Sequence, residues 1–263
     1  MARSALGGRF SIGARIVLRL TYDGPTAQAE QARRNPHLEP RGVGAMEIVW
    51  FGLSCFRIRS RTATIVTDPY DKSVGLNLPR LKADIVTISH DAPGHNAARA
   101  IKGEPRVLSG PGEYEISGVF ITGLDIRPEN RRGRSRERRN TIFLFELEDM
   151  RVCHLGDLQH VPSQAEVEEV LGEVDVLLVP VGGGEALNAA QAAEVVSLLE
   201  PRIVIPMHYR VPGLTLKLDP VQKFLKEMGS EKAPTLDALK LSRGDLPEET
   251  QVIVLNLQAQ EEG

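Results

Sequence analysis

The sequence predicts an α/β fold in which two packed β-sheets lie between layers of helices. Three observations support this fold class. Short apolar runs alternate with turn residues along the chain from Met46 onward. The first half of that region consists mostly of predicted strands, whereas helices and strands alternate in the second half. Two stacked sheets with helices outside them bury the apolar face of both kinds of element.

Predicted strands dominate the first half of the domain. Three successive runs, 48–51, 55–58 and 63–67, form a meander interrupted by turn residues. Residues 84–89 are β-branched and nearly continuously apolar, which is typical of a buried strand. The remaining predicted strands of this half are 106–108, 114–116, 119–122, 141–147 and 151–154, the last two forming a hairpin.

The second half alternates predicted helices with buried strands. A first helix over 163–171 opens with Ser163 and Glu166, which together form a capping box. A second helix is expected over 188–199, and a third over 219–228 begins near Pro220 and stops at Gly229. The strands between and after these helices are expected at 175–180, 202–206 and 251–257.

Composition limits the classes of protein to which the chain can belong. Its 263 residues are 41% hydrophobic and 25% charged, as in ordinary globular domains. The net charge of −3 implies no overall attraction to nucleic acid or acidic lipid, and no apolar run is long enough to span a membrane. Cys55 and Cys153 both lie in apolar, strand-like runs, so we expect two buried reduced thiols in a cytoplasmic protein.

The first 45 residues differ from the rest. The stretch from Met1 to Leu20 contains four arginines and no acidic residue, a composition that resembles an organellar transit segment. A polar tract with proline and glycine follows, which predicts disorder. The other interpretation is a mis-annotated extension, with Met46 as the true start. The predicted domains are therefore an extension, 1–45, and one globular domain, 46–263.

An arginine-rich segment, 127–140, interrupts the globular domain and is expected to be an exposed loop. A solvated charged loop is one interpretation. The other is a clamp for an anionic small-molecule substrate or nucleic acid, because guanidinium groups fit phosphate. The arginines proposed for anion binding are Arg131, Arg132, Arg134 and Arg136.

Several predicted strands end in residues that can bind a metal. His90 follows the strand 84–89, Asp157 follows 151–154, and His208 follows 202–206. Asp68 comes directly after the strand 63–67, and a Pro-Gly turn could bring His95 beside His90. Because ligands in layered α/β folds collect where strands end, these residues predict a site for Zn²⁺, or for Mn²⁺ or Fe²⁺.

The sequence here resembles the metallo-β-lactamase-fold hydrolases, in the branch near the ascorbate-phosphate lactonase-like proteins. The resemblance extends over about 46–228, and the matching stretches are 50–56, 67–69, 89–95, 110–115, 154–157 and 206–209. It implies an αββα four-layer sandwich with a hydrolytic site for one or two metal ions at the sheet edge.

The family's motif His-x-His-x-Asp-His is only partly present. Its first and last histidines correspond to His90 and His95, whereas its second histidine falls on Ala92 and its aspartate on Gly94. The resemblance also implies that Asp157 is the shared aspartate. No histidine occurs between His95 and His154, so a further family ligand is missing.

The resemblance further matches His208 to the family's last histidine and Asp68 to an aspartate that supports the site from behind. One metal position would then keep His90 and Asp157, and the other His95, Asp157 and His208. We expect a single ion in the second position. Asp157, or less directly Asp91 beside the turn, would be the remaining base, while His160 is expected to be a surface residue.

Three functions remain open at this point. The first is a one-metal hydrolase of an ester, lactone or phosphoester. The second is a catalytically inactive pseudoenzyme that retains the sandwich as a binding or regulatory module and binds no metal. The third, and least favoured, is a nucleic-acid-binding protein that uses the arginine-rich segment. Residues 236–241 could also form an exposed amphipathic segment that pairs with another copy in a homo-oligomer.

Overall fold

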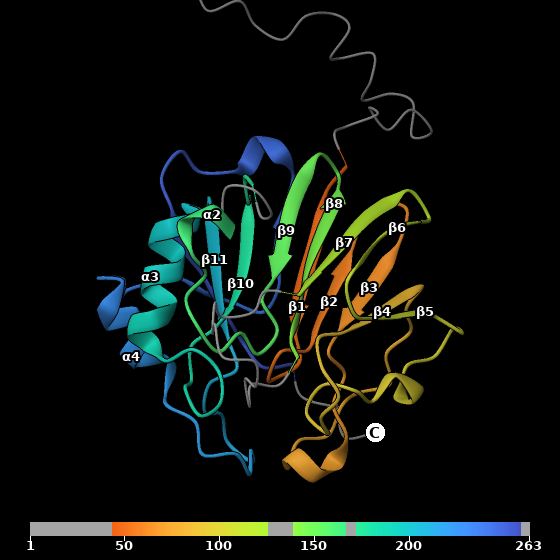
Figure 1. The fold of residues 1–263 in the computed structure, drawn as a ribbon, viewed down its shortest axis with the longest axis horizontal. Helices are drawn as coiled ribbons and strands as arrows, with labels where there is room; N and C mark the ends of the chain where they lie inside the picture. The colour runs from red at the N-terminus through yellow and green to blue at the C-terminus, as the bar shows by residue number, and fades with distance from the viewer. Residues whose placement is uncertain (1–43, 126–138, 167–171, 259–263) are drawn as a thin grey trace, which may run out of the picture. The chain divides into compact units, whose positions relative to one another are not determined.

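Two facing sheets form the centre of the computed structural model (Figure 1), which describes residues 44–125, 139–166 and 172–258. The extension 1–43 and most of the arginine-rich segment lie outside these residues. Residues 43–263 form one unit by their contacts. Within the described ranges, no helix combines the length and apolarity that a bilayer-spanning helix needs.

The first sheet has six strands in the order β13-β1-β2-β3-β4-β5. Antiparallel pairing joins β13, β1, β2 and β3, as the predicted meander requires, whereas β3, β4 and β5 are parallel. The strands are β1 (Met46–Trp50), β2 (Phe56–Arg59), β3 (Thr64–Thr67), β4 (Ile85–Ile88), β5 (Arg106–Ser109) and β13 (Leu239–Leu241).

The second sheet has seven strands in the order β14-β11-β10-β9-β8-β7-β6. Its first four strands are parallel and the others antiparallel, with the predicted hairpin at β8 and β9. The strands are β6 (Gly112–Ile116), β7 (Val119–Asp125), β8 (Thr141–Leu147), β9 (Met150–His154), β10 (Val176–Pro180), β11 (Ile203–Met207) and β14 (Gln251–Val252). A small separate sheet pairs β12 (Thr235–Leu236) with β15 (Val254–Leu255).

The longer described helices lie along the second sheet. Figure 1 shows α3 (Ala189–Leu199) and α4 (Val221–Glu227) beside β10 and β11. Asn188 caps α3 in a capping box with Gln191, which fixes the start of that helix. The shorter helices are η1 (Lys72–Val74), η2 (Ala98–Ala100), α2 (Gln164–Glu166) and η4 (Arg243–Asp245). The predicted α/β sandwich of two sheets is therefore confirmed.

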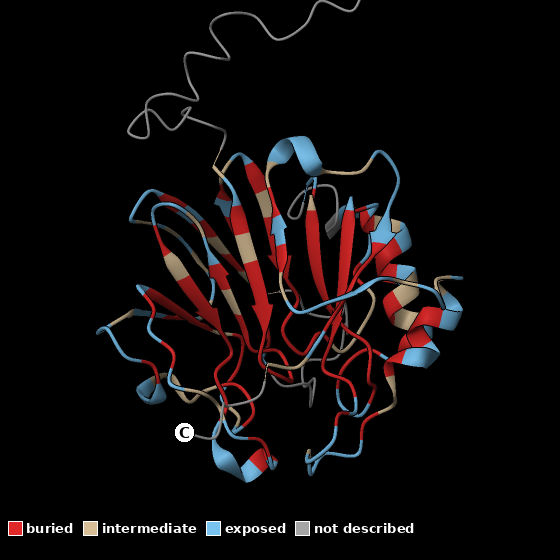
Figure 2. Cartoon of the chain, turned by 180° about the vertical axis from the view of Figure 1, so that it is seen from behind, coloured by how far each residue is buried: buried red, intermediate tan, exposed pale blue. Residues whose placement is uncertain are grey.

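The apolar core follows the strands of both sheets (Figure 2). Strands β10 and β11 are buried at every position, as their continuous apolar sequence predicts. Both cysteines are free and buried, which confirms the prediction of two reduced thiols. Many loop residues at the lower edge of the strands in Figure 2 are also buried. Polar groups in those loops must therefore find partners within the protein.

Two predictions for the C-terminal region were wrong. Residues 236–241 are not a free amphipathic segment, because Leu239 and Leu241 are buried and β13 pairs with β1 of the same chain. The single strand expected over 251–257 is divided at Ile253. Its first part, β14, joins the second sheet, whereas β15 pairs with β12. Pairing with distant strands decided both outcomes, and local periodicity contains no information about such partners.

Candidate metal centre

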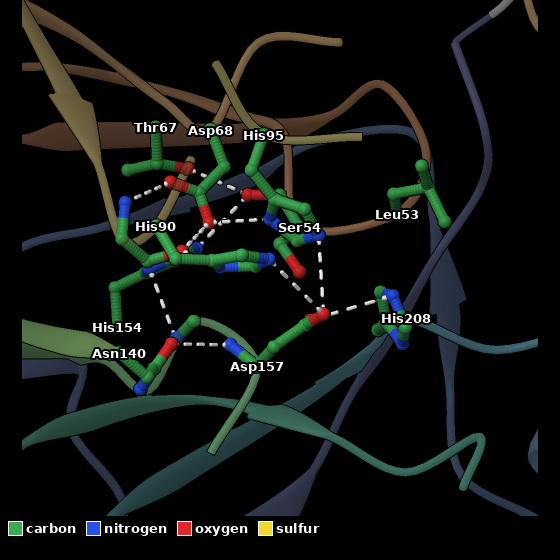
Figure 3. Close-up of polar contacts among 12 residues, drawn as sticks. Leu53, Ser54, Thr67, Asp68, His90, His95, Asn140, His154, Asp157 and His208 are labelled. Carbon is green, nitrogen blue, oxygen red and sulfur yellow. Dashed lines mark hydrogen bonds and ion pairs between the residues drawn. The ribbon is translucent and has the colours of Figure 1, made fainter. Parts of the chain in front are cut away.

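Four predicted metal ligands converge on one point at the ends of the parallel strands. His90 follows β4, Asp157 follows β9, and His208 directly follows β11. The Asp157 carboxylate lies 3.2 Å from His95 Nε2, 3.3 Å from His208 Nε2 and 3.7 Å from His90 Nε2. All four side chains are buried and come from both sheets (Figure 3). The parallel parts of the two sheets therefore end at a common site.

The two oxygens of Asp157 face different histidines. His90 and His95 approach Oδ2, whereas His208 approaches Oδ1. Ligand atoms of His90, His95 and Asp157 all lie within 4.8 Å of one another, and these residues make up the metal-ligand cluster found in the described part of the chain. The expected trio of His95, Asp157 and His208 is thus not the tightest set. His90, His95 and Asp157 form the compact set, although His90 Nε2, at 3.7 Å, is the farthest of the three histidine nitrogens from the Asp157 carboxylate.

Asp68 lies behind the two histidines and connects them. Its carboxylate accepts hydrogen bonds from Ser89 N at 2.7 Å and Ser89 Oγ at 2.6 Å. Asp68 Oδ2 also lies 2.8 Å from His95 Nδ1, and Ser89 Oγ lies 3.0 Å from His90 Nδ1. One buried carboxylate therefore orients His95 directly and His90 through Ser89. Carboxylates and hydroxyls placed in this way fix the ring orientation of metal-binding histidines.

This network assigns the tautomers of both imidazoles. An ionised Asp68 can only accept, so the proton shared with His95 belongs to Nδ1. Ser89 donates its single hydroxyl proton to Asp68, so it accepts the proton of His90 Nδ1. Nε2 of each ring is therefore the atom left to bind a cation, and both Nε2 atoms point at Asp157.

The electrostatics of the centre favour a positive charge. Burial would lower the pKa of His95, but the carboxylates of Asp157 and Asp68 together raise it to about 10. Burial would likewise raise the pKa of Asp157, but His208, His95 and His90 hold it well below its ordinary value. The pKa of Asp68 is lowered against burial by the hydrogen bond and charge of His95. A proton or a metal ion can supply this positive charge.

The turn that presents Asp157 depends on residues that the sequence analysis missed. Asn140 is buried. Its Oδ1 accepts a hydrogen bond from Asp157 N at 2.8 Å, and its Nδ2 donates one to Leu155 O at 2.9 Å. Gly156 has a φ of 57°, and a Cβ there would lie 2.5 Å from Asn140 Oδ1 and from Ser89 Cβ. Asn140 was expected in an exposed loop. The only feature of the sequence that could have indicated the role of Asn140 is its position directly before the apolar strand 141–147.

A tight turn at 51–55 holds the opposite side of the centre. Leu53 O accepts from His208 N at 3.0 Å and from Trp50 Nε1 at 2.9 Å. Ser54 O accepts from Thr67 Oγ1 at 2.8 Å and lies 2.9 Å from His154 Nε2. Because burial lowers the pKa of His154, this ring stays neutral and acts as a structural link within the site wall.

Two residues of the centre have strained backbone conformations. Asp68 has a φ of 38° and His208 a φ of 52°, a region that costs an L-residue about 1–2 kcal/mol. The backbone of Gly182 packs directly against that of His208, because a Cβ at Gly182 would lie only 2.1 Å from His208 O. This close packing holds His208 in place. Such conformations persist where the surroundings over-determine them, and they cluster at functional sites.

Other candidate residues lie apart from the centre. Asp91, the alternative base, is exposed, and its carboxylate accepts a hydrogen bond from Asn96 Nδ2 at 2.6 Å. His160 is partly buried, and no ion pair joins it to Asp157 within the described residues. The arginines proposed for anion binding, Arg131, Arg132, Arg134 and Arg136, lie outside the described residues.

Comparisons with known proteins show the family to which the chain belongs. The β-lactamase superfamily domain matches residues 47–208. A UPF0173 protein of Pyrococcus abyssi is 30% identical over 191 residues, covering 64% of this chain and 85% of its own length. A UPF0173 metal-dependent hydrolase of the same organism is 31% identical, covering 51% of this chain and 59% of its own.

A solved structure extends the similarity to the fold. The chain resembles the crystal structure of a putative Zn-dependent hydrolase of the metallo-β-lactamase superfamily from Thermotoga maritima. The two are 42% identical with a TM-score of 0.68, and the match covers 81% of this chain and all (100%) of that one. A putative metal-dependent hydrolase from Parabacteroides distasonis is 20% identical with a TM-score of 0.55, which shows the shared fold alone.

Proposed function

This chain belongs to the metallo-β-lactamase superfamily, and from that membership together with the geometry of its centre we propose that it is a hydrolase that uses one divalent cation. One observation carries the proposal. The hydrogen-bond network directs Nε2 of His90 and Nε2 of His95 at the same oxygen of Asp157. This arrangement favours a positive charge between the two imidazoles and the carboxylate, and a divalent cation bound to both Nε2 atoms would supply it.

The ligand set favours Zn²⁺. Imidazole nitrogen and carboxylate oxygen are ligands that zinc accepts, and manganese or iron could use the same set. Ligand atoms on one zinc ion lie no more than about 4.2 Å apart, because each bond is about 2.1 Å long. The distances of 3.2 Å and 3.7 Å from Asp157 Oδ2 to His95 and His90 fit within that limit. His208, on the Oδ1 side, is placed to complete the site.

The residues that replace the family's other ligands support a single ion. Ala92 and Gly94 offer no donor side chain. A Cβ built on Gly94 would face Leu53 Cδ1 at 3.4 Å and Val74 Cγ1 at 3.8 Å, both apolar atoms. A side chain at position 94, where the family has a carboxylate, would therefore contact apolar atoms in this chain. An apolar environment at that position disfavours a second cation.

The proposed reaction is hydrolysis of an ester, a lactone or a phosphoester of a small molecule. The cation would supply a Lewis acid and an activated water at neutral pH. The chain's own residues orient that reaction: Asp68 and Ser89 hold the two imidazoles, and Asn140 holds the turn of Asp157. Asp157 is the proposed catalytic carboxylate because it faces all three histidines.

Metal analysis of the purified protein, combined with ligand variants, tests this function. We expect about one equivalent of zinc per chain. His95→Ala and His90→Ala should weaken zinc binding more than about 100-fold, exceeding the effect of losing a residue that only supports a ligand. His208→Ala should abolish hydrolysis of a panel of nitrophenyl esters, lactones and phosphodiesters. His160→Ala is the matched control and should change neither property.

Two results would contradict the proposal. A protein that binds no zinc even after loading, and whose stability is unaffected by chelation, would be the inactive binding module instead. Zinc that binds equally well to His95→Ala and to the unaltered chain would place the ion elsewhere.

A further inference from the structure

The hydroxyl of Ser54 is buried beside the centre without a partner. Ser54 has 0% of its surface exposed, and its Oγ has no hydrogen-bond partner among the described residues. A buried hydroxyl in that condition costs free energy comparable to a lost hydrogen bond. Nearly all buried polar side chains in folded proteins have a partner, so an exception that faces a candidate site can mark the position of a group that is not part of the chain.

The contacts of the 51–55 turn hold the backbone of Ser54 in place. Its backbone oxygen is held by Thr67 Oγ1 at 2.8 Å and lies 2.9 Å from His154 Nε2. The same turn is tied to His208 through the carbonyl of Leu53. With its backbone held from these sides, Ser54 directs its hydroxyl toward the space between His90, His95 and Asp157 (Figure 3). The unpartnered atom is thus aimed at the proposed cation position.

We propose that the Ser54 hydroxyl is the hydrogen-bond partner of the solvent or substrate oxygen that binds at this centre. This inference rests on the proposed function. A serine hydroxyl can donate one hydrogen bond and can also accept hydrogen bonds. It can therefore orient such an oxygen without removing its proton. The family resemblance implies that the motif aspartate, which can bind metal and orient the attacking water, falls on Gly94 in this chain. Ser54 would take over the orienting part of that role from the opposite loop.

Ser54→Ala tests the inference in the full-length protein. In the metal-free protein the change removes an unpartnered hydroxyl, so the melting temperature should stay the same or rise. In the zinc-loaded protein it removes a partner of the bound oxygen. Zinc affinity, measured by competition with a chromophoric chelator, should fall about tenfold. The visible absorption of the Co²⁺-substituted protein should shift as well, because the geometry around the ion changes.

Thr87→Val is the matched control. Thr87 is also fully buried, and its Oγ1 also lacks a hydrogen-bond partner among the described residues, but it lies within strand β4. The near-isosteric change removes an equivalent hydroxyl away from the cation position. It should leave zinc affinity and the Co²⁺ spectrum unchanged.

The outcomes separate this inference from the proposed function. If the unaltered protein binds no zinc, both are overturned. If it binds zinc and Ser54→Ala leaves affinity and the Co²⁺ spectrum unchanged, the role of Ser54 is overturned while the hydrolase proposal stands. If Ser54→Ala lowers the melting temperature of the metal-free protein as much as that of the loaded protein, Ser54 is a packing residue only.

Discussion

At the scale of single residues, the candidate metal centre depends on one buried carboxylate that is not a ligand. Asp68 orients His95 directly and His90 through Ser89, and thereby decides which nitrogen of each ring faces the centre. Its own backbone lies in the left-handed region. The arrangement exchanges local strain for a fixed orientation of the two Nε2 atoms, both of which face Asp157.

Asp68→Asn should therefore weaken zinc binding without a large change in shape. The amide keeps the size of the carboxyl group but can donate to His95, so the preferred tautomer is lost. We expect affinity to fall about 10- to 100-fold, as measured by chelator competition. Asp84→Asn is a suitable control, because Asp84 accepts from Thr64 N outside the centre. Unchanged zinc affinity in Asp68→Asn would show that the imidazoles need no support from this residue.

At the scale of elements, the turns after the strands position the chemistry. Parallel pairing aligns Thr67 of β3 with Thr87 of β4, and Pro180 of β10 with Met207 of β11. In each sheet, the loops that follow these paired strands therefore begin at the same edge of the sheet. Each must then bend sharply to bring a side chain inward. Gly156 makes the bend before Asp157, in a conformation that favours glycine.

Gly156→Ala should destabilise the protein and displace Asp157. The backbone conformation alone costs about 1–2 kcal/mol, and the contact with Asn140 and Ser89 adds to it. Gly118→Ala isolates the backbone cost, because Gly118 has a φ of +75° and nothing lies within 4 Å of the position that a methyl group would occupy. Urea unfolding should show a larger loss for Gly156→Ala, accompanied by weaker zinc binding. Equal losses in the two variants would mean that the turn can relax around the methyl group.

At the scale of the whole molecule, the buried charges link stability to pH and to metal. The folded-state pKa of His95 is raised to about 10 from an ordinary value of 6.5. Its protonated form therefore stabilises the metal-free protein below about pH 6.5, and this contribution is lost as the pH rises toward 10. Asp157 and Asp68 have lowered pKa values, so their contributions are lost on acidification.

Zinc should change this pH dependence. Zinc competes with the proton on His95, whose folded-state pKa is about 10, so the stabilisation by zinc should grow between about pH 6.5 and 8.5 as that competition weakens. Melting temperatures of metal-free and zinc-loaded protein across that range measure the difference. His95→Asn should flatten the metal-free profile. A metal-free protein that becomes more stable with rising pH in this range would contradict the assignment of charge to His95.

The sequence by itself determined which residue follows each buried strand, and therefore which side chains could meet at the sheet edge. Strand patterns predicted the two-sheet fold because burial dictates which residue types occur along a strand. Only the tertiary structure decided that Nε2 of His90 and Nε2 of His95 face the same oxygen of Asp157, and that Asp91 is exposed. Only it placed Asn140 at the turn of Asp157 and left the buried hydroxyl of Ser54 without a partner among the described residues. The physical reason is that strand periodicity is a local property, whereas the distances among these side chains depend on how two sheets and their loops close around one point.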